Sequence, residues 1–286
     1  MSVPHPVHRR ALALMFASVL AFTANVLLVR ALGAMQVDNV WLIVCARFVV
    51  GLALIVAVYR VEFQPTHLWK NPKLIERGLV GGLATYLTYL TVIKLGAGRA
   101  VFIGNTYVIW GALLAAWILR EPLQRSVISG SVTALVGLAL LTNIVATTAA
   151  PGVYDFVAVG TAWMSAYVVV TIRQLHSTEH TSTIFAAQCV YGLLLCSGPA
   201  VATWQPIPAV AWPVLVLASA LAGVGQLTLT RAFRDLPVGE GSLLQMLVPV
   251  GIAAGGMVFF GERFHAHEFL GAGLILAGTA FTAWRK

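Results

Sequence analysis

Two apolar stretches decide the fold: AVFIGNTYVIWGALLAAWILREP at residues 100–122 and GSLLQMLVPVGIAAGGMVFFGER at residues 241–263. Each stretch begins with 20 uncharged residues. A helix of about 20 apolar residues is long enough to cross the hydrocarbon core of a bilayer. A glutamate closes each stretch, Glu121 in the first and Glu262 in the second. The two stretches therefore predict membrane spans that recur along the chain.

Glu121 and Glu262 are 141 residues apart, and we call this spacing the repeat interval. Further pairs of similar residues along the chain have the same spacing. After the two glutamates it relates Gly130 to Gly271 and Gly137 to Gly278. It also pairs Gly82 with Gly223, Leu95 with Leu236, Gly98 with Gly239, and Arg47 with Gln188. This pattern predicts two repeats, residues 1–148 and residues 149–286, joined into one membrane domain. Because each repeat holds an odd number of spans, the second repeat must enter the membrane in the opposite orientation, as in many transporters.

The composition excludes a soluble or disordered chain. Hydrophobic residues make up 59% of the 286 residues and charged residues 10%, whereas a soluble domain has about 25% charged residues. We expect an all-α integral membrane protein with ten transmembrane helices around a central cavity. The ten apolar runs are residues 11–29, 40–59, 78–93, 100–119, 126–146, 156–172, 183–203, 211–230, 241–260 and 269–284.

The basic residues predict the orientation of the chain. Thirteen of the 18 Lys and Arg residues fall on the side of the two termini, four fall on the other side, and Arg47 lies within a span. Basic residues accumulate in cytoplasmic loops, so both termini are predicted to be cytoplasmic. The three cysteines, Cys45, Cys189 and Cys196, lie inside apolar runs without any CxxC motif, and we interpret them as small core residues.

The ten runs, the Arg47–Phe48 pair in the second run, and the glutamate-then-glycine pattern after the fourth and ninth runs resemble the EamA family. This family belongs to the drug/metabolite transporter superfamily, and within it the chain is most similar to the bacterial aromatic amino acid exporters. The resemblance covers about residues 10 to 284. It implies two inverted five-span repeats, with spans one, three, four, six, eight and nine around the cavity, and localisation in the bacterial inner membrane.

Aromatic side chains that lie deep in the runs are candidates for the wall of a substrate cavity. Aromatic residues of the membrane interface belong near the ends of spans, and a buried tyrosine hydroxyl needs a polar partner. The candidates are Tyr86 and Tyr89 in the third run, Trp110 in the fourth, and Trp163 and Tyr167 in the sixth. Packing against lipid is the alternative for each of them.

Uncharged polar side chains in the runs are candidates for substrate anchors, with hydrogen bonds between helices as the alternative. They are Asn25, Asn105, Gln226 and Gln245; Gln188 is a further amide in a run. Gln245 precedes Pro249 by four residues, so its carbonyl loses its helical N–H partner. The fourth run has Val108 at the position equivalent to Pro249, which predicts a kink in the second repeat alone.

The charged residues favour a carrier without a protonated carboxylate in the middle of the membrane. Arg47 is the one charge deep in a run, and it either caps backbone carbonyls or binds a substrate carboxylate. Glu121 and Glu262 lie at run ends. They either carry protons, or pair with Arg120, Arg125 or Arg263, or cap the following helix. No Asp, Glu, Lys or His falls in the interior of a predicted run.

The sequence therefore predicts a transporter that exports small hydrophobic or aromatic amino acids and related metabolites through a central cavity by alternating access. The alternatives are a carrier for a nucleotide sugar or a phosphorylated metabolite and, less in keeping with the residues, a membrane-embedded enzyme. We expect no catalytic residues, no metal site and no cofactor, since no catalytic or phosphate-binding motif occurs. The expected partners are the amino acid substrate and the lipid bilayer, with no nucleic acid, and the expected state is a monomer.

Overall fold

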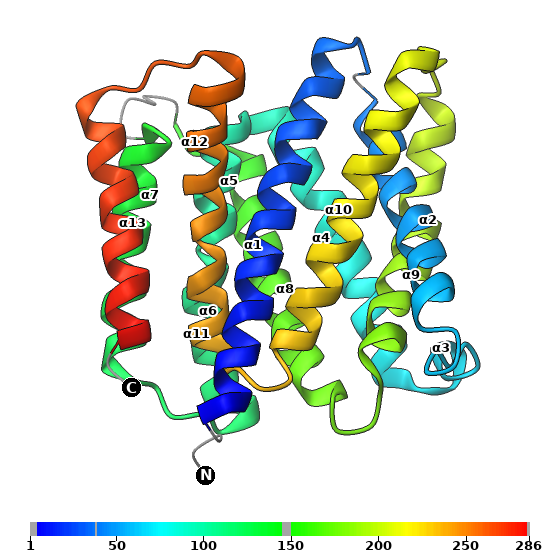
Figure 1. The fold of residues 1–286 in the computed structure, drawn as a ribbon, viewed down its shortest axis with the longest axis horizontal. Helices are drawn as coiled ribbons and strands as arrows, with labels where there is room; N and C mark the ends of the chain where they lie inside the picture. The colour runs from blue at the N-terminus through cyan, green and yellow to red at the C-terminus, as the bar shows by residue number, and fades with distance from the viewer. Residues whose placement is uncertain (1–4, 38, 145–149, 285–286) are drawn as a thin grey trace. The chain divides into compact units, whose positions relative to one another are not determined.

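The computed structural model describes residues 5–37, 39–144 and 150–284, and over these ranges the secondary structure is helical, without strands (Figure 1). The chain forms two compact units. Unit 1 comprises residues 1–86 and 171–235, and unit 2 comprises residues 87–170 and 236–286. Each unit therefore contains helices from both halves of the sequence.

Unit 1 contains most of the early helices together with two from the second half of the chain. They are α1 (His5–Ala34), α2 (Val40–Val58), α3 (His67–Lys70), the first part of α4 (Pro72–Leu95), the end of α8 (Val153–Leu175), α9 (Thr181–Ala202), the short η3 (Ala209–Ala211) and α10 (Trp212–Ala232).

Unit 2 contains the remaining helices. They are the rest of α4 and α8, α5 (Ala97–Asn105), α6 (Tyr107–Leu114), the π-helical turn η1 (Ala115–Leu119), α7 (Arg125–Leu141), α11 (Val238–Gln245), α12 (Leu247–Phe260) and α13 (Ala266–Trp284).

Eight helical segments in the described ranges are long and apolar enough to cross a membrane. They correspond to eight of the ten predicted runs, so the prediction of ten spans is not confirmed. The fifth run corresponds to α7, whose 17 residues extend about 25 Å, short of the ~30 Å hydrocarbon core. This helix stops early because Asn143 has a left-handed φ of 49°. The tenth run corresponds to α13, which is also not among the eight.

Helix boundaries recur at the repeat interval. In the first half, helices begin at Val40, Ala97 and Arg125, and in the second half helices begin at the equivalent positions Thr181, Val238 and Ala266. Spans four and nine also end alike: Arg120 and Gly261 both have a left-handed φ, of 56° and 65°. The next N–H in each case bonds back over one turn, Glu121 to Ala115 and Glu262 to Gly256. Gly261 suits this conformation, whereas Arg120 adopts it at a cost of about 1 kcal/mol.

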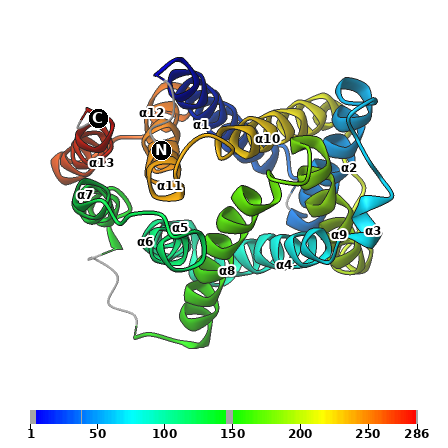
Figure 2. The same ribbon diagram turned by 90° about the horizontal axis from the view of Figure 1, so that it is seen from below.

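In unit 2, α7 and α13 lie side by side (Figure 2) and run antiparallel (Figure 1). They meet at glycines. A Cβ built on Gly137 would lie 2.5 Å from the Gly271 carbonyl oxygen, and one on Gly271 would lie 2.5 Å from the Gly137 carbonyl oxygen. Gly130 and Gly278 oppose each other in the same way, at 2.7 and 2.6 Å. Because Gly130 is equivalent to Gly271 and Gly137 to Gly278, each helix presents the same surface to the other, as in a two-fold contact.

Unit 1 contains a second contact of this kind, between α2 and α9. A Cβ on Gly51 would lie 3.1 Å from Cys189 Sγ, and a Cβ on Gly192 would lie 2.6 Å from the Phe48 ring. Phe48 and Cys189 are one repeat interval apart, as are Gly51 and Gly192. Equivalent helices thus pack against each other in both units.

Spans four and nine are both broken near their middle. The first is divided at Thr106 into α5 and α6, and the second at Met246 into α11 and α12. The prediction of a kink in the second repeat alone is therefore wrong. In span four, Asn105 Nδ2 and Thr106 Oγ1 donate to the carbonyls of Val101 and Ile103, at 2.8 and 2.6 Å. Such bonds from side chains to the preceding turn bend helices without a proline.

In span nine the break explains how the proline is accommodated. Pro249 is the third residue of α12, and the first four N–H groups of a helix have no partner within that helix. A residue without an N–H therefore costs no helical hydrogen bond at this position.

We expect Gly271→Ala to destabilise the protein by about 1–3 kcal/mol, because its methyl group would press on the Gly137 carbonyl. Gly273→Ala is the matched control, since a Cβ at Gly273 meets nothing within 4 Å. There alanine should be neutral or stabilising, by up to about 1 kcal/mol, through its higher helix propensity. Thermal unfolding in detergent micelles measures both. Equal melting temperatures for the two variants would contradict the glycine contact.

Candidate functional site

The broken spans bring polar groups together inside unit 2. The half-helix α6 packs on α11, and the Tyr107 hydroxyl donates to the Ser242 carbonyl at 3.4 Å. Gly111 permits this approach, since a Cβ there would lie 3.5 Å from Val238. Two half-helices, one from each half of the chain, therefore meet through polar and small residues, an arrangement that transporters use near a substrate.

The predicted aromatic residues fall in both units. In unit 2, the rings of Trp163 and Tyr167 on α8 stack at 6.1 Å and 10°, and Trp163 is 47% exposed. Tyr89 on α4 and Trp110 on α6 also belong to unit 2. In unit 1, Tyr86 stacks on Trp41 at 4.5 Å and 20°. Trp41 lies on a different helix from Tyr86, and no spacing rule relates residues on different helices. The contact between them could therefore not be predicted from the sequence.

The predicted amide residues are mostly buried, and two of them make hydrogen bonds to backbone carbonyls. Asn25 Nδ2 on α1 donates to the Ala218 carbonyl on α10 at 2.8 Å, which is the interhelical role named as the alternative. Asn105 bonds within its own helix at the break in span four. Gln226 lies buried on α10, and Gln245, buried as well, is the last residue of α11.

Three of the nine predicted site residues, Asn25, Tyr86 and Gln226, thus belong to unit 1, and the other six belong to unit 2. A hollow in unit 2 is lined by none of the nine; it lies beside Glu121 and Glu240. Within unit 2, the structure brings Trp163 and Tyr167 together.

Unit 1 contains a buried charge that the sequence analysis placed in a loop. The helix α4 starts at Pro72 rather than near residue 78, so Arg77 lies within a span and is fully buried. Its Nη2 donates to Gln188 Oε1 at 3.0 Å, while its Nε and Nη1 have no acceptor in the described part of the chain. Proline in the first turn after an asparagine is a helix start signal, and Asn71–Pro72 supplies one.

Arg47 lies on α2, which packs on α9 in unit 1. Its guanidinium is 5.6 Å from the centre of the Phe22 ring. Among the residues that the structure describes, neither Arg47 nor Arg77 has a carboxylate partner. Two guanidinium groups therefore gather around α9 in unit 1, where the sequence analysis expected one.

Unit 2 contains two partly or fully buried carboxylates at one end. Glu121 Oε2 accepts the N–H of Val238, the first residue of α11, at 3.0 Å. This bond caps α11, whereas the sequence predicted a cap on the helix that follows Glu121, which is α7. Glu240 lies in the first turn of α11 and is 3% exposed. The start of a helix favours negative charge. The structure therefore contains a buried carboxylate, Glu240, at the end of span nine, one residue before the predicted run 241–260.

Comparison with known proteins gives the family and the fold. The sequence model of the EamA-like transporter family matches residues 9–143 and again residues 152–284. A solved structure described only as "Crystal structure of protein" is 17% identical, covers 95% of each chain, and superposes with a TM-score of 0.80. No curated protein matches the chain. At this identity the solved structure shows a shared fold alone.

We expect Gln188→Met to lower the stability by about 2 kcal/mol, because it leaves the buried Arg77 guanidinium without its hydrogen bond. Arg77→Met combined with Gln188→Met removes the charge as well, and a buried ion costs several kcal/mol to desolvate. The double variant should therefore melt at or above the temperature of the wild type. Thermal unfolding in micelles compares the three proteins, and a double variant less stable than Gln188→Met would show that the guanidinium itself stabilises unit 1.

Proposed function

Because the chain belongs to the EamA-like transporter family, we propose that this membrane transporter exports small hydrophobic or aromatic amino acids and related metabolites. The observation that carries the proposal is the Trp163–Tyr167 pair on α8, whose parallel rings leave Trp163 47% exposed. A flat aromatic surface inside a transporter favours an aromatic or apolar ligand, and each ring contact adds about 0.5–1.5 kcal/mol beyond burial. Tyr86, Tyr89 and Trp110 are proposed as further aromatic residues that contact the substrate.

A zwitterionic substrate also needs polar groups that replace its lost hydration. The buried amides of Gln226 and Gln245 are proposed for this role, with Asn25 and Asn105. An amide nitrogen carries two donor hydrogens, and among the described residues the hydrogen bond of Asn25 Nδ2 is to the Ala218 carbonyl. Gln245 is the last residue of α11, directly before the break in span nine at Met246. It is therefore next in sequence to backbone that leaves the regular helix.

Alternating access is proposed to rest on two inverted five-span repeats, residues 1–148 and 149–286. The recurrence of helix starts at the repeat interval supports this. The antiparallel contact of α7 with α13, whose glycines are equivalent, also supports it. Two similar halves of opposite orientation can exchange conformations and so open one site to each side in turn.

The proposed location is the bacterial inner membrane, with both termini in the cytoplasm and the protein acting as a monomer. The predicted topology has thirteen Lys and Arg residues on the terminal side against four on the other. Without Arg77, which is buried within α4, twelve remain on the terminal side, and this bias supports the proposed orientation.

The alternative of a carrier for phosphorylated metabolites or nucleotide sugars gains one observation, the buried Arg77 in unit 1. Guanidinium groups bind phosphate oxygens in a bidentate manner. The transport assay below therefore includes a competitor of this class.

We expect Trp163→Ala to reduce phenylalanine transport in proteoliposomes by about 2- to 13-fold, the range that one lost ring contact implies, and threonine transport by less. Trp117→Ala is the matched control, because Trp117 lies in a span and is 80% exposed. Equal losses in the two variants would contradict an aromatic site on α8. Competition by a sugar phosphate, without competition by phenylalanine, would favour the alternative carrier.

We expect single cysteines at Gln124 and His265 to react with an impermeant maleimide from opposite sides of the membrane. These positions are one repeat interval apart and directly precede α7 and α13. The background replaces Cys45, Cys189 and Cys196 with alanine. Reaction from one side alone at both positions would show that the repeats are parallel.

A further inference from the structure

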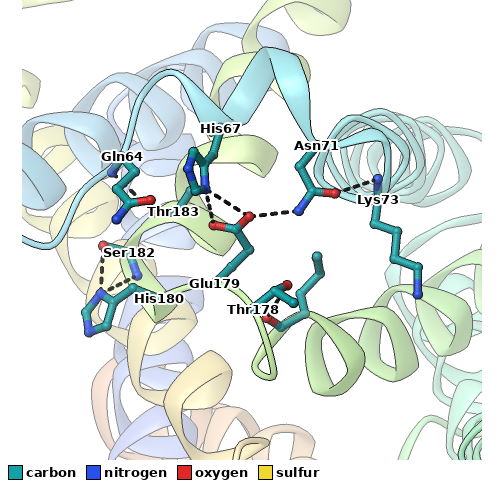
Figure 3. A network of polar contacts seen from close by, with 10 residues as sticks. Gln64, His67, Asn71, Lys73, Thr178, Glu179, His180, Ser182 and Thr183 are labelled. Atoms are coloured by element: carbon teal, nitrogen blue, oxygen red, sulfur yellow. Dashed lines mark hydrogen bonds and ion pairs between the residues drawn. The ribbon is translucent and has the colours of Figure 1, made fainter.

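Within unit 1, a polar network attaches the segment between α2 and α4 to α9 and to the loop before α9 (Figure 3). The Glu179 carboxylate, whose side chain is 4% exposed, binds His67 Nδ1 at 3.1 and 3.0 Å and accepts from Asn71 Nδ2 at 2.7 Å. The Gln64 N–H donates to Thr183 Oγ1 at 3.3 Å. These bonds fix α3 against the loop before α9 and against the start of α9.

A second set of contacts joins α3 to a residue further along α9. The Tyr191 hydroxyl donates to the Leu68 carbonyl at 2.9 Å, and Leu68 itself is buried. The Tyr191 ring meets the edge of the Trp69 ring at 5.6 Å. Although α3 has four residues, it is therefore attached to α9 at several points.

The outward surface of this segment combines an exposed indole with exposed basic side chains. Trp69 is 62% exposed despite its contact with Tyr191. Lys70, Lys73 and Arg60 are also exposed. An exposed tryptophan beside lysines is typical of a surface at the membrane–water boundary, where the indole lies at the level of the headgroups.

The same end of unit 1 has an excess of positive charge. The ends of α2 and α10 and the starts of α1, α4 and α9 lie together at this end (Figure 1). Apart from the buried Arg77, the segments there contain eight basic residues against four acidic ones. The basic residues are Arg9, Arg10, Arg60, Lys70, Lys73, Arg173, Arg231 and Arg234, and the acidic residues are Glu62, Glu76, Glu179 and Asp235.

The charge of this surface comes from lysine and arginine rather than from histidine. Burial lowers the pKa of His176 and of His180, both of which follow α8 outside the span. Their rings are therefore neutral at neutral pH. Of the four carboxylates, that of Glu179 points inward and is engaged by His67 and Asn71.

We propose that the surface formed by Arg60, Trp69, Lys70 and Lys73 binds the headgroup of an anionic phospholipid in the leaflet on the terminal side. The lysines contact the lipid phosphate, and Trp69 packs along the upper part of the acyl chains. Juxtamembrane basic residues attract anionic lipids, and here the rigid attachment of α3 holds the basic residues beside the indole. This site is separate from the substrate site of the transporter.

The experiment measures binding of dioleoylphosphatidylglycerol to the purified full-length protein, with dioleoylphosphatidylcholine as the neutral lipid. Phosphatidylglycerol should raise the melting temperature in micelles by several degrees more than phosphatidylcholine, and about 0.5 M NaCl should reduce this difference because salt screens exposed charges. Lys70→Gln with Lys73→Gln should weaken phosphatidylglycerol binding about 25-fold, at about fivefold for each basic residue. The matched control is Lys94→Gln with Arg263→Gln, two exposed residues in unit 2, and it should bind as the wild type does.

Two further measurements test the proposal even if the lysine variant folds poorly. Brominated phosphatidylglycerol should quench tryptophan fluorescence more in the wild type than in Trp69→Phe, since Trp69 would lie against the lipid. Glycerol 3-phosphate should not raise the melting temperature, because the site takes a lipid rather than a free phosphate. Three results would each overturn the proposal. They are an equal loss of phosphatidylglycerol binding in the lysine variant and the control variant, equal quenching with and without Trp69, and stabilisation by glycerol 3-phosphate.

Discussion

The close approach of helix backbones at glycine is the contact on which both units depend. Within lipid, helices gain little from the hydrophobic effect, so association relies on dispersion forces and on backbone proximity. The α7–α13 contact places Gly130 and Gly137 against Gly278 and Gly271, and the α2–α9 contact uses Gly51 and Gly192. In each case the partner is the equivalent helix of the other half of the chain. One pattern of small residues, present twice in the sequence, therefore builds each unit from both halves.

The broken spans are the second shared feature, and they give the transporter irregular backbone within unit 2. Bilayers tolerate interrupted helices only where protein or a water-filled space satisfies the freed backbone groups. Here α5, α6, α11 and α12 supply such groups near the contact of Tyr107 with Ser242. The two breaks arise by different chemistry, since side chains of Asn105 and Thr106 bond to the preceding turn in one span while a proline begins the helix after the break in the other.

Charge is placed where the structure can stabilise it or where function requires it. Glu121 caps α11 and Glu240 lies in its first turn, so the helix dipole favours both carboxylates. Arg77 is different, because its one hydrogen bond in the described residues is to the neutral Gln188. A buried guanidinium in this setting costs stability.

Local sequence by itself determined that the chain is helical and crosses a membrane, since a long run of uncharged, apolar residues has few other stable states in water or lipid. It also determined the repeat interval and showed that Gly130, Gly137, Gly271 and Gly278 recur at it, whereas their contacts came from the structure. Of the candidate site, it identified the Trp163–Tyr167 pair, because neighbours on one helix face follow from spacing. Only the tertiary structure decided that α2 pairs with α9, that Trp41 stacks on Tyr86, that Glu121 caps α11 and that Arg77 is buried within α4. Such features depend on contacts between segments far apart in the chain, and no local pattern of residues specifies which distant surface a helix will meet.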